Sequence, residues 1–233
     1  MKKNTDFYNK ESIVYSQKRY PKLANSFTTF FFKKRLAIVI DYLCDIPKKE
    51  DLSFLEIGCA DGVVIKNVLE QNLLFKRVSG VDVSPKMIEV ANKGEYKQNV
   101  FFSVRDDKKI TTEDIIVEVG VLNLIDYKKE FSFVYEHLNP NGYYICTVSS
   151  KESLLNFFKR TKQLLHLNWR CDYEREMKKY FETIKISPVG LFIPFLWKFG
   201  KLSLYLQLFF DKVFRFLPSF YHERVYFLKK KSV

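Results

Sequence analysis

One loop constrains the fold of this chain more than any other part of its sequence. It follows the short apolar run 53–57 and contains Gly58, Ala60 and Gly62, and a segment of helical periodicity comes directly after it. A strand, a loop of small residues and a helix, in this order, form the first unit of a parallel sheet. Such a loop presents unpaired backbone amides at the start of a helix, where phosphate or nucleoside groups bind. Taken alone, the pattern is equally typical of a tight structural turn.

Apolar runs of strand length alternate with helical segments along the rest of the chain, which indicates the α/β class. No linker or repeat divides the sequence, so we expect a single domain over residues 1–233. It would carry an N-terminal helical lid, residues 1–50, and an apolar helical insertion, residues 187–221, between the last two strands. The expected strands lie near residues 53–57, 77–83, 99–104, 114–119, 142–148, 181–186 and 224–228.

Side-chain caps place two of the helices between these strands. Ser84 precedes an expected helix over 86–92, and Asp126 precedes one over 128–138, because both side chains can accept from free amides at a helix start. Helical periodicity predicts an aromatic helix over 27–43 and a long helical stretch over 151–180. Turn-forming residues over 139–142 predict a turn that leads into the fifth strand.

An acidic residue stands at the expected end of the second strand. Asp82 follows Gly62 by twenty residues. At that spacing, a carboxylate on the neighbouring strand can accept hydrogen bonds from two ribose hydroxyls. The loop and Asp82 together predict an adenosine site. Because the loop reads Glu-x-Gly-x-x-x-Gly and not Gly-x-Gly-x-x-Gly, a dehydrogenase is not favoured.

With an acidic residue inside the strand, the segment from Glu56 to Gly62 resembles the first motif of class I S-adenosylmethionine-dependent methyltransferases. The resemblance implies a Rossmann-like methyltransferase fold, with a seven-stranded, mostly parallel sheet, helices on both faces and an antiparallel last strand. It also implies S-adenosyl-L-methionine as the cofactor. Four further segments resemble later motifs of the family, namely 81–84, 100–106, 118–123 and 138–142.

The resemblance assigns cofactor-binding residues by their place in these motifs. Asp82 would bind the ribose, and Met87 would pack on the adenine. Asp106, or failing it Asp107, would accept a hydrogen bond from the adenine amino group, and Glu118 lies at the strand end that borders the transferred methyl. The full expected set is Glu56, Gly58, Cys59, Ala60, Gly62, Asp82, Val83, Met87, Arg105, Asp106 and Glu118.

The acceptor side is less well defined. Ala60 replaces a common middle glycine, and Asn123 follows the fourth strand where many members carry a charged residue or histidine, so no acceptor-side role is carried over. A hydroxyl acceptor would need a general base, whereas an amine bound in its neutral form would not. The weak catalytic candidates are Tyr20, Asn123 and His222, each of which has an equally simple structural interpretation.

The net charge of +12 favours an acidic partner, which could be nucleic acid, anionic lipid or a phosphorylated small molecule. Nucleic acid is the least favoured, because the chain lacks the Asn/Asp-Pro-Pro-aromatic motif of base amino-methylating relatives and any evident RNA-binding module. The four cysteines show no metal-ligand spacing, so we expect no metal. The polar N-terminus shows no secretory signal, which predicts a cytoplasmic protein.

The insertion at 187–221 is unusually apolar for a surface connection. Its uncharged run is shorter than the roughly 20 residues that span a bilayer. On a helical wheel over 200–217, most apolar side chains share one face, and Ser203, Gln207 and Asp211 lie on the other together with Lys212 and Arg215. The helix is expected either to pack on the sheet or cover the acceptor pocket, or to rest in a membrane leaflet through residues 197–217. Residues that would help the second arrangement are Trp197, Lys198, Lys201, Lys212, Arg215 and 229–231.

We therefore expect a methyltransferase that moves a methyl group to an O or N atom of a small-molecule, glycan-precursor or lipid-linked acceptor by in-line displacement. It would be cytoplasmic, and it would contact the inner face of a membrane if the insertion rests in a leaflet. The alternatives are an RNA or DNA methyltransferase, which the positive charge supports, and a non-catalytic, membrane-associated binding protein with the same fold. The sequence gives no oligomeric state.

Overall fold

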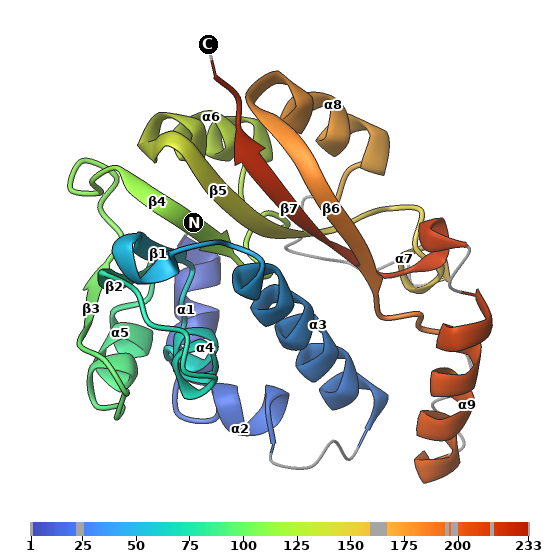
Figure 1. Cartoon of the computed structure of the whole chain (residues 1–233). Helices are drawn as coiled ribbons and strands as arrows, with labels where there is room; N and C mark the ends of the chain where they lie inside the picture. The colour runs from blue at the N-terminus through green and yellow to red at the C-terminus, as the bar shows by residue number, and fades with distance from the viewer. Residues whose placement is uncertain are drawn as a thin grey trace.

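A computed structural model of the protein describes residues 2–21, 26–158, 167–193, 196, 200–214 and 217–232. Its centre is a seven-stranded sheet in the order β3-β2-β1-β4-β5-β7-β6 (Figure 1). β7 runs antiparallel to both of its neighbours, and the other paired strands are parallel. The predicted Rossmann-like α/β fold with an antiparallel last strand is therefore confirmed. The strands are β1 Ser53–Ile57, β2 Arg77–Asp82, β3 Val100–Val104, β4 Glu113–Glu118, β5 Leu138–Ser149, β6 Phe181–Val189 and β7 Glu223–Lys230.

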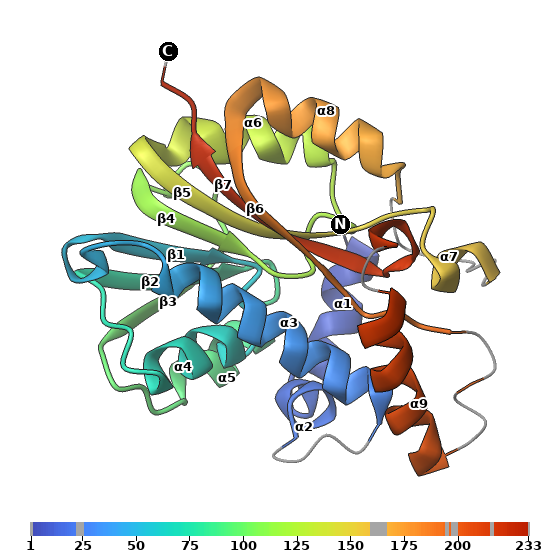
Figure 2. The same cartoon turned by 45° about the vertical axis from the view of Figure 1, so that its right-hand side comes forward.

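Helices cover both faces of this sheet (Figures 1 and 2). On one face, α3, α4 and α5 enclose a core that includes Leu36, Ile65 and Ile88. On the other face, α6 and α8 pack over a second core that includes Phe131 and Met177. The described helices are α1 Lys2–Glu11, α2 Tyr15–Arg19, α3 Phe27–Cys44, α4 Val63–Glu70, α5 Pro85–Asn92, α6 Tyr127–His137, α7 Leu154–Phe158, α8 Arg170–Tyr180 and α9 Gly200–Val213, with short 3-10 turns at Lys49–Asp51 and Pro218–Phe220.

The predicted caps start their helices as expected. Ser84 accepts from the amide of Met87 at 3.2 Å, and Asp126 accepts from the amide of Lys128 at 3.1 Å. Each side chain satisfies one of the amides that a helix start leaves unpaired. The sequence therefore predicts the start of α5 and α6 for the correct physical reason.

Two segments differ from the sequence prediction. β5 begins at Leu138, before the expected turn, because Leu138 pairs with Glu113 and the chain then bulges before Tyr143 pairs with Ile115. The turn over 139–142 therefore lies inside the strand as an irregularity. The expected continuous helix over 151–180 is also wrong. It is divided into α7 and α8, and Asn168 forms an isolated bridge with Ser150 between them, while residues 159–166 lie outside the described part.

The predicted apolar insertion contains α9, whose orientation is the reverse of what a packed amphipathic helix requires. Ser203, Gln207 and Asp211, on the polar side of the wheel, are buried, whereas Tyr205 and Phe209 are 69% and 61% exposed. The predicted packing of the apolar face on the sheet is therefore wrong for this helix. Trp197, Lys198, Arg215 and Phe216, which the prediction included, lie outside the described residues.

A buried ion pair ties the first long helix to the last strand. Arg35 of α3, only 4% exposed, donates to both carboxylate oxygens of Glu223 in β7, at 3.1 and 3.3 Å. Glu223 also accepts from the hydroxyl of Ser149 at the end of β5, and Arg35 donates to the hydroxyl of Tyr20 at 3.3 Å. This network fixes α2 and α3 against the carboxyl ends of the strands.

We expect Arg35→Met to lower the free energy of unfolding by about 3–5 kcal/mol, because it leaves the buried carboxylate of Glu223 without its charge partner. Urea denaturation would measure the change. The double variant Arg35→Met/Glu223→Gln should recover part of the loss, since no unpaired charge remains. Lys93→Ala, which breaks the exposed pair with Glu89, is the control and should change stability far less. Equal effects of Arg35→Met and Lys93→Ala would contradict this account.

Candidate functional site

The loop between β1 and α4 has the conformation that its small residues allow. Gly58, Ala60 and Gly62 all have positive φ, at 74°, 49° and 79°. A side chain at Gly58 would collide with Val121 of the loop after β4. The absence of a side chain at Gly58 therefore allows the two loops to approach each other closely. Ala60 adopts the left-handed region despite its methyl group, which costs it roughly 1–2 kcal/mol relative to an ordinary conformation.

Asp82 joins this loop to the next strand end. Its Oδ2 accepts from the amide of Ala60 at 3.0 Å, and its Oδ1 accepts from the amide of Ser84 at 2.8 Å. Burial raises the pKa of this carboxyl above its ordinary value, although the two amide bonds oppose the shift. Each carboxylate oxygen accepts one of these bonds and keeps a further lone pair for a ligand.

A cavity opens beside Asp82 at the carboxyl ends of β1, β2 and β4. The structure brings five of the predicted cofactor residues to its wall, namely Gly58, Ala60, Asp82, Val83 and Arg105. The other residues of the wall are not among the cofactor-binding residues expected from the sequence. These are Tyr8 and Tyr15 from the N-terminal helices and Val119, Gly120, Val121, Leu124 and Ile125 after β4. Val119, Gly120 and Val121 belong to the motif at 118–123. Tyr8 and Tyr15 both lie in the N-terminal lid expected over residues 1–50, although no motif marks these two positions.

The N-terminal helices are held against this cavity by side-chain hydrogen bonds. The backbone amide of Ser16, in α2, donates to Asp61 Oδ2 at 3.1 Å, and the Ser16 hydroxyl donates to the same oxygen. In α1, Asn9 Oδ1 accepts from the hydroxyl of Ser84 at 2.6 Å. The first helices therefore bind to the loops on both sides of Asp82.

The other predicted cofactor residues do not line this cavity. Glu56, Cys59 and Met87 are buried at 1%, 1% and 0% exposure, and Gly62 forms the N-cap of α4. Burial raises the pKa of Glu56 well above its ordinary value. Asp106 is exposed and lines a separate surface hollow, where Lys109 Nζ lies 3.4 Å from its carboxylate.

Glu118 faces the protein interior. Its carboxylate accepts from the hydroxyl of Tyr144. Burial, and after it the neighbouring carboxylate of Glu130, raise the pKa of Glu118 well above its ordinary value of 4.5. Arg105 lies 2.9 Å from Glu130 and 2.6 Å from Asp107, the fallback adenine partner, so both acids form ion pairs with it. The cluster adjoins the cavity through Arg105, which lines the wall.

The three weak catalytic candidates have structural partners. Asn123 donates to the Ser149 hydroxyl at 3.0 Å and accepts from the Ser149 amide at 3.1 Å, which fixes the loop after β4 to β5. Tyr20 accepts from Arg35. The ring of His222 packs edge to face on Phe31 and Phe192. Of the three, none lines the cavity beside Asp82.

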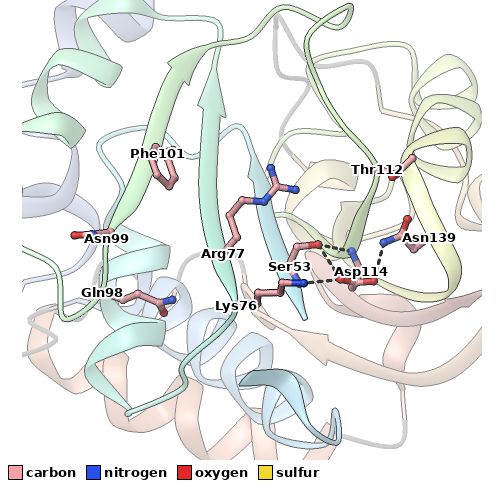
Figure 3. A pocket seen from close by; sticks show the side chains of 9 residues that line it. All are labelled: Ser53, Lys76, Arg77, Gln98, Asn99, Phe101, Thr112, Asp114 and Asn139. Carbon is pink, nitrogen blue, oxygen red and sulfur yellow. Dashed lines mark hydrogen bonds between the residues drawn. The ribbon is translucent and has the colours of Figure 1, made fainter. Parts of the chain in front are cut away.

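A second, more open cavity lies at the opposite edge of the sheet (Figure 3). Three of its polar residues pair with one another: Asp114 accepts from the amide and hydroxyl of Ser53, both at 2.9 Å, and from Asn139 at 2.7 Å. The amino ends of the strands meet there, whereas ligands of open α/β sheets bind at the carboxyl ends. We therefore assign the functional site to the cavity beside Asp82.

The sequence and this geometry place the chain in a known family. Residues 22–184 match the family model described as "Methyltransferase domain", which is more than half of the chain, so the chain belongs to this family. Together with the seven-stranded fold, the match confirms the predicted class, an S-adenosylmethionine-dependent methyltransferase. A search of curated proteins found no match by sequence.

Solved structures of methyltransferases share the fold at low sequence identity. Magnesium protoporphyrin IX methyltransferase from Synechocystis PCC 6803, with bound SAH, aligns with a TM-score of 0.69 at 13% identity over 97% of this chain and 98% of that one. The plantazolicin methyltransferase BpumL, in complex with a triazolic desmethylPZN analog and SAH, aligns at 0.60 and 21% over 96% and 90%. A putative methyltransferase in complex with the Haloferax volcanii Trm112 activator aligns at 0.66 and 13% over 98% and 96%.

Two further features concern metals and membranes. Over the described ranges, no three His, Cys, Asp or Glu side chains form a group that could hold a metal ion. None of the helices described here is both long and apolar enough to cross a bilayer.

We expect Glu118 to contribute a fall in stability as the pH rises above about 4.5, its ordinary pKa. A carboxyl with a raised pKa in the folded state keeps its proton there while the unfolded chain loses it, so rising pH favours unfolding. Glu118→Gln should make this fall shallower in urea denaturation measured between pH 5 and pH 8. Glu136→Gln, at an exposed position of α6, is the control and should keep the wild-type slope. An unchanged slope in Glu118→Gln would show that Glu118 ionises normally.

Proposed function

We propose that the protein transfers a methyl group from S-adenosylmethionine to an O or N atom of a small-molecule, glycan-precursor or lipid acceptor, in the cavity beside Asp82. One observation carries this proposal. Two backbone amides hold the Asp82 carboxylate at the point where the loop after β1 and the end of β2 meet. Asp82 forms part of the cavity wall there. A carboxylate in this place suits the two hydroxyls of a ribose.

The residues of the cavity fit this donor. Asp82 would bind the ribose, and the missing side chain at Gly58 leaves room for close backbone approach. Val83 and Arg105 would border the adenosine, since they follow β2 and β3 on the same edge. Structures of the Synechocystis methyltransferase with bound SAM and with bound SAH support this choice of donor.

When bound, the donor supplies a methyl group already activated by a positively charged sulfur. The protein then has to orient the acceptor and exclude water. Val119, Val121, Leu124 and Ile125 form an apolar wall suited to both tasks. They follow β4, where the family motif places the transferred methyl.

None of the described residues that line the cavity is placed as a general base. Burial raises the pKa of Tyr8 and of Tyr15 above the ordinary tyrosine value, so both remain neutral phenols at neutral pH and neither acts as a base. Asp82 already accepts two amide hydrogen bonds. This arrangement favours an acceptor atom that needs no proton removed by the protein, such as an amine bound in its neutral form.

The N-terminal helices would act as a lid over the donor. Tyr8 and Tyr15 line the cavity, and Ser16 and Asn9 bind the loops beside Asp82. A bound donor has to share this space with the two tyrosines, so α1 and α2 would move apart from the loops and close again over the donor. Such closure would also exclude water from the reaction.

The acceptor would enter from the side of α3 and α9. An apolar acceptor, or one linked to a lipid, suits the apolar wall after β4 and the apolar residues of the insertion. A peripheral contact through residues 197–217 would place a cytoplasmic protein at the inner face of a membrane. The net charge of +12 also leaves an RNA acceptor to be tested.

We expect Asp82→Asn to weaken binding of S-adenosylhomocysteine roughly tenfold or more. The asparagine side chain carries no charge for the ribose hydroxyls, and its single oxygen can accept from only one of the two backbone amides that Asp82 now binds. Isothermal titration calorimetry would measure the affinity. In the wild type, the affinity should fall on acidification, and it should begin to fall at a higher pH than for an ordinary aspartate, since protonation of Asp82 removes an acceptor. Asp82→Asn should lack this dependence.

Asp51→Asn, an exposed change distant from the cavity, is the matched control and should bind as the wild type does. Asp106→Asn, measured in parallel, decides whether that exposed carboxylate also contributes to adenine binding. Undiminished binding by Asp82→Asn would refute the proposed donor site. Absence of binding by the wild type would instead favour a non-catalytic protein that keeps the fold.

The acceptor can be identified with methyl-labelled donor and fractionated extracts of lipids, sugar nucleotides, small molecules and RNA. We expect label in a lipid or small-molecule fraction, and no label with the Asp82→Asn variant. Label that appears on RNA alone would overturn the proposed acceptor class while leaving the methyltransferase activity in place.

A further inference from the structure

The helix α9 lies at the same edge of the sheet as the donor cavity. β6 ends at Val189, which pairs with Glu223 at the start of β7, and Glu223 also pairs with Ser149 at the end of β5. The chain between β6 and β7 therefore projects from the carboxyl edge of the parallel strands. Both views show α9 at the periphery, beside the beginning of α3 (Figures 1 and 2).

Polar contacts attach α9 to the body of the protein. Lys34 of α3 forms an ion pair with Asp211, and the hydroxyl of Tyr221 donates to the backbone carbonyl of Asp211 at 2.8 Å. Gln207, 1% exposed, accepts from the amide of Ile193 at 3.4 Å. Buried polar groups need such partners, so this side of the helix is fixed toward the protein.

The opposite side of α9 presents large apolar side chains to the outside. Leu202, Tyr205, Phe209 and Val213 recur at intervals of three and four residues, and all four are exposed. Lys212, adjacent to Val213, is exposed as well. Because the polar side of α9 packs on the protein, its apolar side is free to contact another apolar surface, such as a partner protein or a membrane.

Area and charge favour a membrane surface over a second copy of the chain. Side chains of this size and exposure give a patch on the order of 400 Å², whereas a stable protein interface buries about 800 Å² on each partner. A bilayer does not need a larger area of complementary shape, because the side chains insert into it. Residues 189–221 contain four basic residues and one acidic residue, Asp211, and Lys34 neutralises the latter. The surplus positive charge matches anionic headgroups.

We propose that the exposed apolar side of α9 inserts into the headgroup region of an anionic lipid bilayer and sets the donor cavity beside the membrane surface. The bilayer is the partner of this helix, and Tyr205 and Phe209 are its main anchors. This proposal assigns the peripheral contact suggested above to named side chains, and it does not depend on methyl transfer. The corollary that the acceptor is drawn from the bilayer does rest on the proposed function.

Flotation with vesicles of phosphatidylcholine and phosphatidylglycerol tests the contact without any donor present. We expect the wild type to bind these vesicles and to bind pure phosphatidylcholine vesicles more weakly. The double variant Tyr205→Ser/Phe209→Ser should bind roughly tenfold less, because the two aromatic side chains that insert into the bilayer are lost. Both side chains are exposed and serine has a similar helix propensity, so the fold should persist.

Phe101→Ser is the matched control, since Phe101 is an exposed aromatic on β3, away from α9, and its loss should leave vesicle binding unchanged. Asp82→Asn should also keep vesicle binding, which separates this contact from the donor site. Failure of the wild type to bind anionic vesicles, or equal binding by the double variant, would overturn the proposal. Dimerisation that Tyr205→Ser/Phe209→Ser abolishes, without vesicle binding, would assign the patch to a second copy instead.

Discussion

The carboxylate of Asp82 organises the site on which the function of this chain depends. Its two oxygens accept from amides of two different loops, one after β1 and one after β2, so a single side chain sets the spacing between two strand ends. The positive φ angles of the first loop are compatible with that spacing. In turn, the N-terminal helices bind to residues beside these amides, Asp61 and Ser84. Loss of the carboxylate would therefore alter the loop, the cavity and the lid together.

Local rules predicted most of the fold. Strand-length apolar runs and side-chain caps are short-range patterns, so β1 and the starts of α5 and α6 follow from neighbouring residues alone. The long helix expected over 151–180 failed for the opposite reason. The bridge between Ser150 and Asn168 is a contact between residues far apart in sequence, and periodicity contains no information about it.

The candidate site was predicted in part, and the omissions have a common cause. Motif spacing found Asp82 and the glycine loop, because both lie on the backbone frame of the sheet. It could not show that Glu118 turns inward to Tyr144 or that Asp106 points to solvent, since side-chain direction depends on neighbours such as Glu130 and Lys109. The orientation of α9 was also wrongly predicted, because a helical wheel separates two faces of a helix but does not show which face packs on the protein.

The pair of Arg35 and Glu223 has a consequence for the order in which the chain can fold. The two residues are 188 positions apart, so during synthesis the arginine emerges long before its partner. Until β7 inserts between β5 and β6, α3 carries a cation that cannot be buried without a large penalty. The helix is therefore prevented from packing fully on an incomplete sheet. We therefore expect final closure of the core to wait for the last strand, with this face of a nascent chain hydrated until then.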